Sequence, residues 1–244
     1  MQENHDSRGN LKSGISDDDW MIVLFATAGV SEFIENSLQG IRACGIDPGL
    51  VHVVIPMNAA DELSALVRKF GAVPRVLEDV ISSDCIGNTL RGYVDYGTPE
   101  FNHLMRVRFR ILRALLCETK RIISADIDIA WFRNPLPYLS KVLTRYPWAC
   151  QTEAVAAFPP NFCVGFFALL ATQECLELID AHIAMFSSDR ASPTLTMQQT
   201  FNQLIKDQPK YLSMLFPLPE ALFSNGLLYS SIKARDAAQD TECH

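Results

Sequence analysis

The chain has 244 residues, of which 48% are hydrophobic. This size can bury one substantial core and suits one large domain or two small ones. The formal net charge is −7 and the lysines and arginines form no stripe, which argues against a nucleic-acid-binding surface. The seven cysteines occur singly, without a Cys-x-x-Cys pair, so the sequence indicates neither a disulfide framework nor a zinc site.

Residues 1–19 are polar and contain no apolar core of the kind that a signal peptide has. No later stretch approaches the ~18 consecutive apolar residues that a membrane-spanning helix needs. We therefore expect a disordered lead over residues 1–19 and a soluble, cytoplasmic protein without a membrane span. A soluble fragment of a membrane-anchored parent would have the same composition, so that alternative stays open.

The first third of the chain after this lead alternates short apolar strands with amphipathic helices. Strands are expected at 21–26, 51–56 and 73–77, and helices at 31–44 and 59–70. A continuous apolar run such as Met-Ile-Val-Leu-Phe-Ala is typical of a buried parallel strand. This order predicts a parallel sheet joined by right-handed crossovers.

Residues 78–99 interrupt the alternation with glycines, a proline and polar side chains, and they predict a long loop. Loops of this length in a compact domain often serve as functional lids. The helix expected over 100–117 leads directly into a strand that ends at two aspartates. This helix carries four arginines: Arg106, Arg108, Arg110 and Arg113.

The second half of the chain continues the alternation and shows no repeat and no linker to a second domain. Helices are expected at 136–144, 172–187 and 195–207, strands at 148–152 and 163–170, and a turn-rich segment at 216–229. The predicted fold class is therefore α/β, with a Rossmann-like, mixed but mostly parallel sheet flanked by helices. We expect one domain over residues 20–229 and a polar tail over 230–244.

Asp126 and Asp128 leave the end of an apolar run with one residue between them. Alternate side chains of an extended segment share a face, so both carboxylates point one way while Ile127 and Ile129 point the other. Buried carboxylates need a partner, and no Lys or Arg follows directly. Mg²⁺ or Mn²⁺, which binds carboxylate and phosphate oxygens, is the simplest partner. Alternatively, the pair caps the strand or helps to start the next helix at Asn134–Pro135.

The strand, the aspartates and the following Trp-Phe-Arg-Asn-Pro-Leu resemble the GT-A nucleotide-sugar glycosyltransferases, and within them glycosyltransferase family 77. The resemblance covers roughly residues 20–229 and is strongest over residues 125–139. Three weaker segments follow in the family's order, at 161–169, 198–204 and 218–226. Order and spacing together make the motif more specific than an isolated Asp-x-Asp pair.

The resemblance implies that Asp128 binds Mn²⁺ or Mg²⁺ directly, while Asp126 contacts the metal or the ribose of the donor. Such a metal would neutralise the departing diphosphate. By the same resemblance, Thr27 would line the nucleotide pocket. Arg108 stands where the family usually has a lysine and could approach the diphosphate, although a solvated helix face is the alternative.

Two further segments that match the family contain glycines. Gly165 would let the donor or acceptor approach the backbone closely, or it marks a strand bulge. Asn225 and Gly226 match a late Asn-Gly turn near the donor, although any Asn-Gly pair favours a turn.

The sequence departs from the family pattern in two places. The family commonly has Asp-Gln where this chain has Met197 and Gln198. Gln198 could keep a sugar contact, and Glu153 could replace the missing acidic group that would stabilise positive charge at the anomeric carbon. The family also often presents a late histidine to the metal, and here that residue would be the terminal His244.

The activity implied is a metal-dependent, retaining transfer of a sugar from a nucleotide diphosphate, expected to be UDP-linked. The acceptor would be a hydroxyl group of a glycan, protein or small molecule. One alternative is a catalytically impaired binding module with the same fold. A second is an Asp-x-Asp phosphatase or phosphotransferase, although that chemistry places its motif on the first strand.

Overall fold

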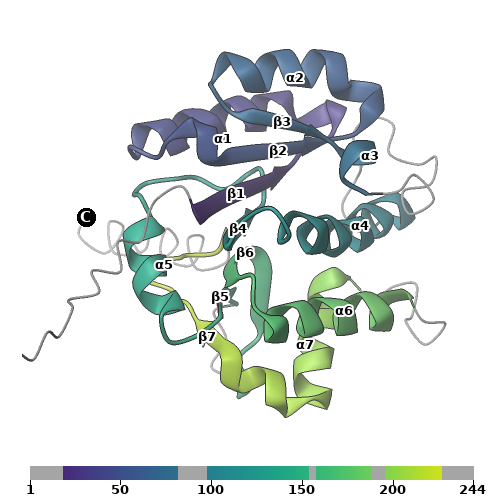
Figure 1. The fold of residues 1–244 in the computed structure, drawn as a ribbon, viewed down its shortest axis with the longest axis vertical. Coiled ribbons are helices and arrows are strands. Elements are labelled where there is room, and N and C mark those ends of the chain that lie inside the picture. The colour runs from purple at the N-terminus through teal and green to yellow at the C-terminus, as the bar shows by residue number, and fades with distance from the viewer. Residues whose placement is uncertain (1–18, 82–97, 154–157, 188–195, 227–244) are drawn as a thin grey trace, which may run out of the picture.

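A computed structural model describes residues 19–81, 98–153, 158–187 and 196–226. Its centre is a seven-stranded sheet with the strand order β3-β2-β1-β4-β6-β5-β7 (Figure 1). The strands are β1 (Trp20–Phe25), β2 (Val51–Ile55), β3 (Val73–Val76), β4 (Arg121–Ala125), β5 (Trp148–Thr152), β6 (Phe162–Leu170) and β7 (Leu215–Pro217).

The sheet is mixed and mostly parallel, which confirms the predicted fold class. Strand β1 lies parallel to β2 and β4, β2 lies parallel to β3, and β5 lies parallel to β7. Strand β6 runs antiparallel to both of its neighbours, β4 and β5. The reversal at β6 places its N-terminal half beside the carboxyl end of β4.

Helices cover both faces of the sheet. The α-helices are α1 (Ser31–Ala43), α2 (Ala60–Lys69), α3 (Leu77–Val80), α4 (Pro99–Leu115), α5 (Leu136–Leu143), α6 (Gln173–Ser187) and α7 (Met197–Asp207). Short 3₁₀ segments are η2 (Ala28–Val30), η3 (Pro48–Leu50), η4 (Met57–Ala59) and η6 (Pro209–Met214). None of the helices in the described ranges is long and apolar enough to cross a bilayer.

The predicted helices and strands are confirmed, and two elements were missed. The segment predicted as a loop over 78–99 begins with part of the one-turn helix α3, while residues 82–97 lie outside the described ranges. Strand β7 lies at the start of the segment predicted to be only turn-rich. The predicted lead and tail fall almost entirely outside the described residues and stay predictions.

Alternation along β1 divides the core into two layers. Met21 and Val23 pack in the layer formed with α4, α6 and α7. Trp20, Ile22 and Leu24 point to the opposite face and pack with α1, α2 and α5. Both faces of a parallel strand are therefore covered, which explains why β1 reads as a continuous apolar run.

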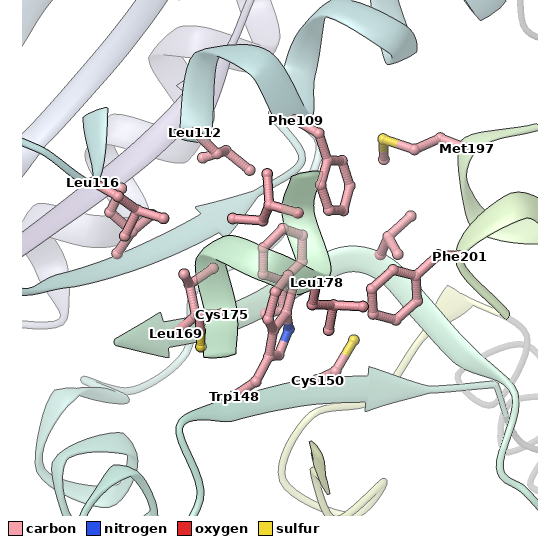
Figure 2. Close-up of a cluster of buried hydrophobic side chains, with 14 of the residues drawn as sticks. Phe109, Leu112, Leu116, Trp148, Cys150, Leu169, Cys175, Leu178, Met197 and Phe201 are labelled. Atoms are coloured by element: carbon pink, nitrogen blue, oxygen red, sulfur yellow. The ribbon is translucent and has the colours of Figure 1, made fainter. Parts of the chain in front are cut away.

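Aromatic side chains fix the helices that carry the candidate site. Phe109 of α4, Trp148 of β5 and Phe201 of α7 are fully buried in one cluster (Figure 2). The ring centroids of Phe109 and Phe201 lie 6.1 Å apart, and those of Trp148 and Phe201 lie 5.6 Å apart. Because aromatic pairs bury a large apolar area, this cluster holds α4 and α7 against the sheet.

Candidate functional site

A pocket of about 460 Å³ opens beyond the carboxyl ends of β1 and β4. Ligands of open α/β sheets bind at this edge of the sheet. The lining includes Phe25 and Thr27 at the end of β1, Arg108 of α4, Asp126 and Asp128 after β4, Gly165 of β6 and Gln198 of α7. The pocket therefore brings together most of the side chains that the sequence predicted for the site.

Asp126 lies on the pocket floor between β4 and β6. Its backbone N–H donates to the carbonyl oxygen of Gly165 over 2.8 Å, which extends the antiparallel ladder by one residue. Its Oδ1 accepts a hydrogen bond from Arg108 Nη1 at 2.5 Å. The Asp126 side chain is 45% exposed, whereas that of Arg108 is only 2% exposed. Both side chains line the pocket, but the carboxylate is the more exposed of the two.

Arg108 is oriented by three groups. Its Nε and Nη2 atoms donate to the hydroxyl of Ser124, at 3.2 and 2.9 Å, and its guanidinium lies 5.0 Å from the centroid of the Phe25 ring. A buried cation is tolerated only when its donors are satisfied, and here Ser124 and Asp126 satisfy them. This burial rules out the solvated helix face that the sequence allowed for Arg108.

Opposing effects act on the Asp126 carboxyl group. Burial in the pocket raises its pKa, the attraction and hydrogen bond of Arg108 lower it, and the nearby Asp128 carboxylate raises it further. Desolvation by the surrounding protein is the largest of these effects. A further cation in the pocket would stabilise the charged form.

Gly165 lies where β6 departs from β5. Cys150 of β5 pairs with Phe167, but the next residue, Gln151, pairs with Cys163, so residues 164–166 have no partner on β5. The bulge reading of Gly165 therefore agrees with the structure. A Cβ atom at Gly165 would also lie 2.7 Å from Asp126 Oδ2, which is closer than real side chains approach. The glycine makes room for the Asp126 carboxylate.

Asp128 lies exposed on the loop that follows β4. The intervening Ile127 and the following Ile129 are partly buried against the core layer of α1, α2 and α5, and Ile127 also lines the pocket. Residues 127 and 128 form a turn, so the alternation predicted for an extended segment does not continue beyond β4. The next helix begins without help from the aspartates, because Asn134 Oδ1 accepts the N–H of Leu136 at 2.9 Å. The helix-starting alternative for the aspartates is therefore wrong.

Trp131 anchors the loop that carries Asp128. Its Nε1–H donates to Ser37 Oγ of α1 at 3.2 Å, and the indole is buried. A Cβ at Gly40 of α1 would lie 3.3 Å from the Trp131 Cβ, so the glycine allows the loop to pack closely on the helix. The Trp in the motif is thus a structural anchor for the aspartate loop.

The described residues contain no group of three or more His, Cys, Asp and Glu side chains arranged to hold a metal ion. Asp126 and Asp128 offer two carboxylates at the pocket, and His244, the third predicted ligand, lies outside the described residues. A hard cation such as Mg²⁺ is often held by one or two carboxylates together with phosphate oxygens and water. The donor set therefore fits a metal that shares its coordination with a bound diphosphate.

Thr27 is buried just after the carboxyl end of β1. Its carbonyl oxygen accepts a hydrogen bond from the N–H of Val30, which begins η2. Its hydroxyl does not cap this turn. The side chain lines the pocket, in the position that the sequence predicted.

Gln198 and Glu153, which are 45 residues apart in the sequence, meet in the structure. Gln198 Nε2 donates to Glu153 Oε1 at 2.5 Å, and Gln198 Oε1 accepts the N–H of Val164 at 3.3 Å. Gln198 lines the pocket, whereas Glu153 is not among the described residues that line it. The preceding Met197 is buried, and its carbonyl oxygen accepts a hydrogen bond from His182 Nε2 at 3.2 Å.

Asn225 and Gly226 do not line the pocket formed by the described residues. Asn225 Nδ2 donates to the carbonyl oxygen of Thr152 at 3.0 Å, so this segment is held beside the end of β5. Gly226 is exposed, and a Cβ there would meet no atom within 4 Å. Their contact with a donor stays a prediction.

Ser124 is a site residue that the sequence reasoning missed. It is fully buried in β4 and accepts both hydrogen bonds that orient Arg108. The available signal was a hydroxyl in the middle of an otherwise apolar strand, because buried polar groups nearly always have a partner.

The family model of the nucleotide-diphospho-sugar transferases matches residues 82–238, which is more than half of the chain. The chain belongs to this family. No curated protein matches this transferase by sequence. Its assignment to glycosyltransferase family 77 stays a prediction.

Two solved structures share the fold of this transferase at low sequence identity. The apo form of mouse xyloside xylosyltransferase 1 gives a TM-score of 0.59 at 12% identity, over 83% of this chain and 85% of that chain. The galactosyltransferase LgtC, solved with donor and acceptor sugar analogues, gives a TM-score of 0.55 at 12% identity, over 82% of this chain and 73% of that chain. The transferase therefore has the GT-A fold. Family membership and the position of the aspartates after β4, rather than after β1, argue against the phosphatase alternative.

Proposed function

We propose that the protein is a metal-dependent, retaining glycosyltransferase that moves a sugar from a UDP-linked donor to an acceptor hydroxyl. The observation that carries this proposal is the convergence of Asp126, Asp128 and Arg108 on one pocket at the carboxyl edge of the sheet. Two carboxylates and a buried guanidinium suit a diphosphate that binds together with a divalent cation.

Asp126 and Asp128 would hold the cation, Mn²⁺ or Mg²⁺. When bound, such an ion supplies Lewis-acid stabilisation of the negative charge that develops on the leaving diphosphate. Asp126 is kept in place by Arg108 and by the absence of a side chain at Gly165. Asp128 is exposed at the pocket and can adjust to the donor.

Thr27 and the apolar residues near it would line the nucleoside part of the donor site. The neighbouring wall is formed by Phe25, Val30 and Phe33, whose side chains would exclude water from one side of the ligand. An apolar wall with a few placed polar groups is the usual composition of a small-molecule site.

Retention with transfer from the front face would need no separate general base. The bond between the anomeric carbon and the diphosphate breaks, the bond to the acceptor oxygen forms, and the acceptor proton passes to the leaving phosphate oxygen. No histidine occurs among the described residues that line the pocket, which agrees with such a route. Gln198 would contact the sugar.

A panel of nucleotide sugars tested for hydrolysis with and without Mn²⁺ checks the proposal without knowledge of the acceptor. We expect UDP-sugar turnover that EDTA abolishes and that Asp128→Asn lowers at least about tenfold, because one carboxylate ligand is lost. Asp128 is exposed, so its substitution tests the site without removing a buried partner. The control is Asp61→Asn, an exposed charge on α2 that lies outside the pocket lining.

Turnover that ignores both EDTA and Asp128→Asn would exclude the metal-dependent route. The stereochemistry of the transfer product, read from its NMR coupling constants, decides whether the anomeric configuration is retained.

The second candidate function is a binding module with impaired catalysis. Met197 favours it, because this buried side chain stands where the resemblance expects an acidic residue. Calorimetry separates the two candidates: a binding module would bind the nucleotide sugar without releasing its sugar, whereas the transferase would turn it over.

A further inference from the structure

Side-chain amides of α7 accept hydrogen bonds from two backbone N–H groups of β6. Residues 164–166 have no partner on β5, so the N–H of Val164 donates instead to Gln198 Oε1 at 3.3 Å. Two residues earlier, the N–H of Phe162 donates to Asn202 Oδ1 at 2.8 Å. Four helical residues rise about 6 Å and two strand residues rise about 6.6 Å, so the two amides match the spacing of the strand.

The two amides differ in what they do with their remaining hydrogen atoms. Asn202 Nδ2 donates to the carbonyl oxygens of Phe162 and Gln198, at 2.8 and 2.9 Å, so both N–H groups of its amide are used within the protein. Gln198 Nε2 donates to Glu153 Oε1 at 2.5 Å, and the Gln198 side chain lines the pocket. Only Gln198 presents its amide to a ligand.

The hydrogen-bond partners of Gln198 determine the positions of the oxygen and the nitrogen of its side-chain amide. A backbone N–H can only donate, so the atom facing Val164 must be the amide oxygen. An ionised carboxylate can only accept, so the atom facing Glu153 must be the amide nitrogen. Within the described residues, no Lys or Arg forms an ion pair with Glu153, so the amide is the partner of this charge.

We infer that Glu153 is a positioning residue that fixes the orientation of the Gln198 amide for a hydroxyl group of the donor sugar. Each group of the fixed amide keeps one unused position, a second N–H on the nitrogen and a second lone pair on the oxygen. A neighbouring donor and acceptor complement a hydroxyl, which can both accept and donate. This inference rests on the proposed function, because that function supplies the sugar.

Glu153 therefore acts through Gln198 rather than by its own charge at the anomeric carbon. Among the described residues, Gln198 lines the pocket and its hydrogen-bond partner Glu153 does not. If charge alone mattered, Glu153→Gln would be as damaging as Glu153→Ala. If orientation matters, Glu153→Gln retains an amide oxygen that can accept from Gln198 Nε2 and so rescues activity.

Donor hydrolysis by a set of variants tests this inference. We expect Glu153→Ala to lower kcat about tenfold with little change in KM, and Glu153→Gln to stay within roughly threefold of the native protein. In a Gln198→Ala background, Glu153→Ala should have no further effect, because the side chain through which it acts is gone. The inference would be overturned if the two Glu153 variants lost equal amounts of kcat. It would also be overturned if the fold-loss in the double variant equalled the product of the fold-losses in the two single variants.

Asn202→Ala is the matched control for helix docking. It removes both hydrogen bonds between Asn202 of α7 and Phe162 of β6, so it should lower the melting temperature without reproducing the fall in kcat of Glu153→Ala. A kcat loss in Asn202→Ala equal to that in Glu153→Ala would show that docking of α7, and not amide orientation, is what matters.

An NMR measurement tests the orientation without any activity. The side-chain amide signals of Gln198, assigned by their loss in Gln198→Ala, should shift or broaden in Glu153→Ala and stay sharp in Glu153→Gln. Unchanged signals in Glu153→Ala would overturn the inference even if the protein is an active transferase. Absence of donor turnover in the native protein would contradict the proposed function. The NMR measurement would then still show whether Glu153 orients the Gln198 amide.

Discussion

Two arginines of α4 form ion pairs with aspartates, and only one of the pairs is buried. Arg108 is 2% exposed and pairs with Asp126, whereas the Arg113 side chain is 36% exposed and pairs with Asp180. Exposed pairs contribute little because water and salt screen them, while a buried cation whose partner is removed is strongly destabilised.

Arg108→Ala should therefore lower the free energy of unfolding by about 3 kcal/mol, because it leaves Ser124 and Asp126 without their partner. Arg113→Ala, on the same helix, should cost less than about 1 kcal/mol. Urea unfolding of both variants measures the difference. Equal losses would mean that the burial of Arg108 does not make its pair stronger.

Gly165→Ala should displace the Asp126 carboxylate, because the new Cβ would lie 2.7 Å from Oδ2. Either the carboxylate turns away from Arg108 or β6 shifts, and overpacking of this kind costs about 1–3 kcal/mol. We expect weaker donor binding by calorimetry together with this loss in urea unfolding. A variant that binds donor as tightly as the native protein would show that Asp126 needs no such room.

At the residue scale, the sequence predicted several of the side chains that line the pocket, but it missed Ser124 and gave none of their pairings. Both aspartates line one pocket, but residues 127 and 128 form a turn, so the period of an extended chain from which a shared face was predicted does not continue beyond β4. The Arg108–Asp126 and Glu153–Gln198 pairs join residues 18 and 45 positions apart, and neither separation has a local pattern. Such partners are set by the crossing of α4 and α7 over the sheet.

Helices α6 and α7 are joined by a buried histidine. His182 of α6 stacks on Phe109 at 4.2 Å between ring centroids and donates to the carbonyl oxygen of Met197 at the start of α7. Burial lowers the pKa of His182 from 6.5 to about 4. The neutral imidazole thus packs against Phe109, Phe186 and Phe201, whose side chains belong to the apolar cluster between α4, α6 and α7.

This pKa shift predicts acid sensitivity at the level of these two helices. The unfolded chain binds the proton more readily than the folded one, so stability is present above pH 6.5 and falls as the pH drops towards 4. The loss should reach about 2 kcal/mol by pH 5. Urea unfolding between pH 7 and 5 measures it, and His182→Gln, which cannot titrate, should flatten the slope. An unchanged slope in that variant would assign the effect to other groups.

Helices and strands with a clear periodicity of apolar residues could be predicted from the sequence, whereas the shortest helix and strand could not. Helix α7 shows an apolar stripe and a Thr196 capping box, in which the Thr196 hydroxyl accepts the N–H of Gln199. Strand β7 has three residues, ends at Pro217 and gains its identity only by pairing with β5. Three residues cannot display an alternation, so a strand of this kind depends on tertiary contacts.

For the whole molecule, the alternation of strands and helices predicted the α/β class, and the resemblance supplied the mixed sheet. The antiparallel direction of β6 could not be inferred from its own residues, because both directions give an apolar run when a strand is buried on both faces. This direction determines the site. It brings Gly165 against Asp126 and sets the β6 bulge beside Gln198.

The pocket joins elements from both halves of the chain, so donor binding should stabilise the molecule as a whole. A ligand at 100 times its Kd adds about 2.7 kcal/mol to the free energy of unfolding, which for a domain of this size raises Tm by roughly 5–10 °C. We expect this shift when UDP-sugar and Mn²⁺ are added together and a much smaller one with either alone, because the proposed metal site would need phosphate oxygens in addition to the two carboxylates. Asp128→Asn should remove most of the shift, whereas Asp61→Asn should keep it. A full shift with nucleotide in the presence of EDTA would mean that Arg108 and the pocket walls hold the diphosphate without a metal.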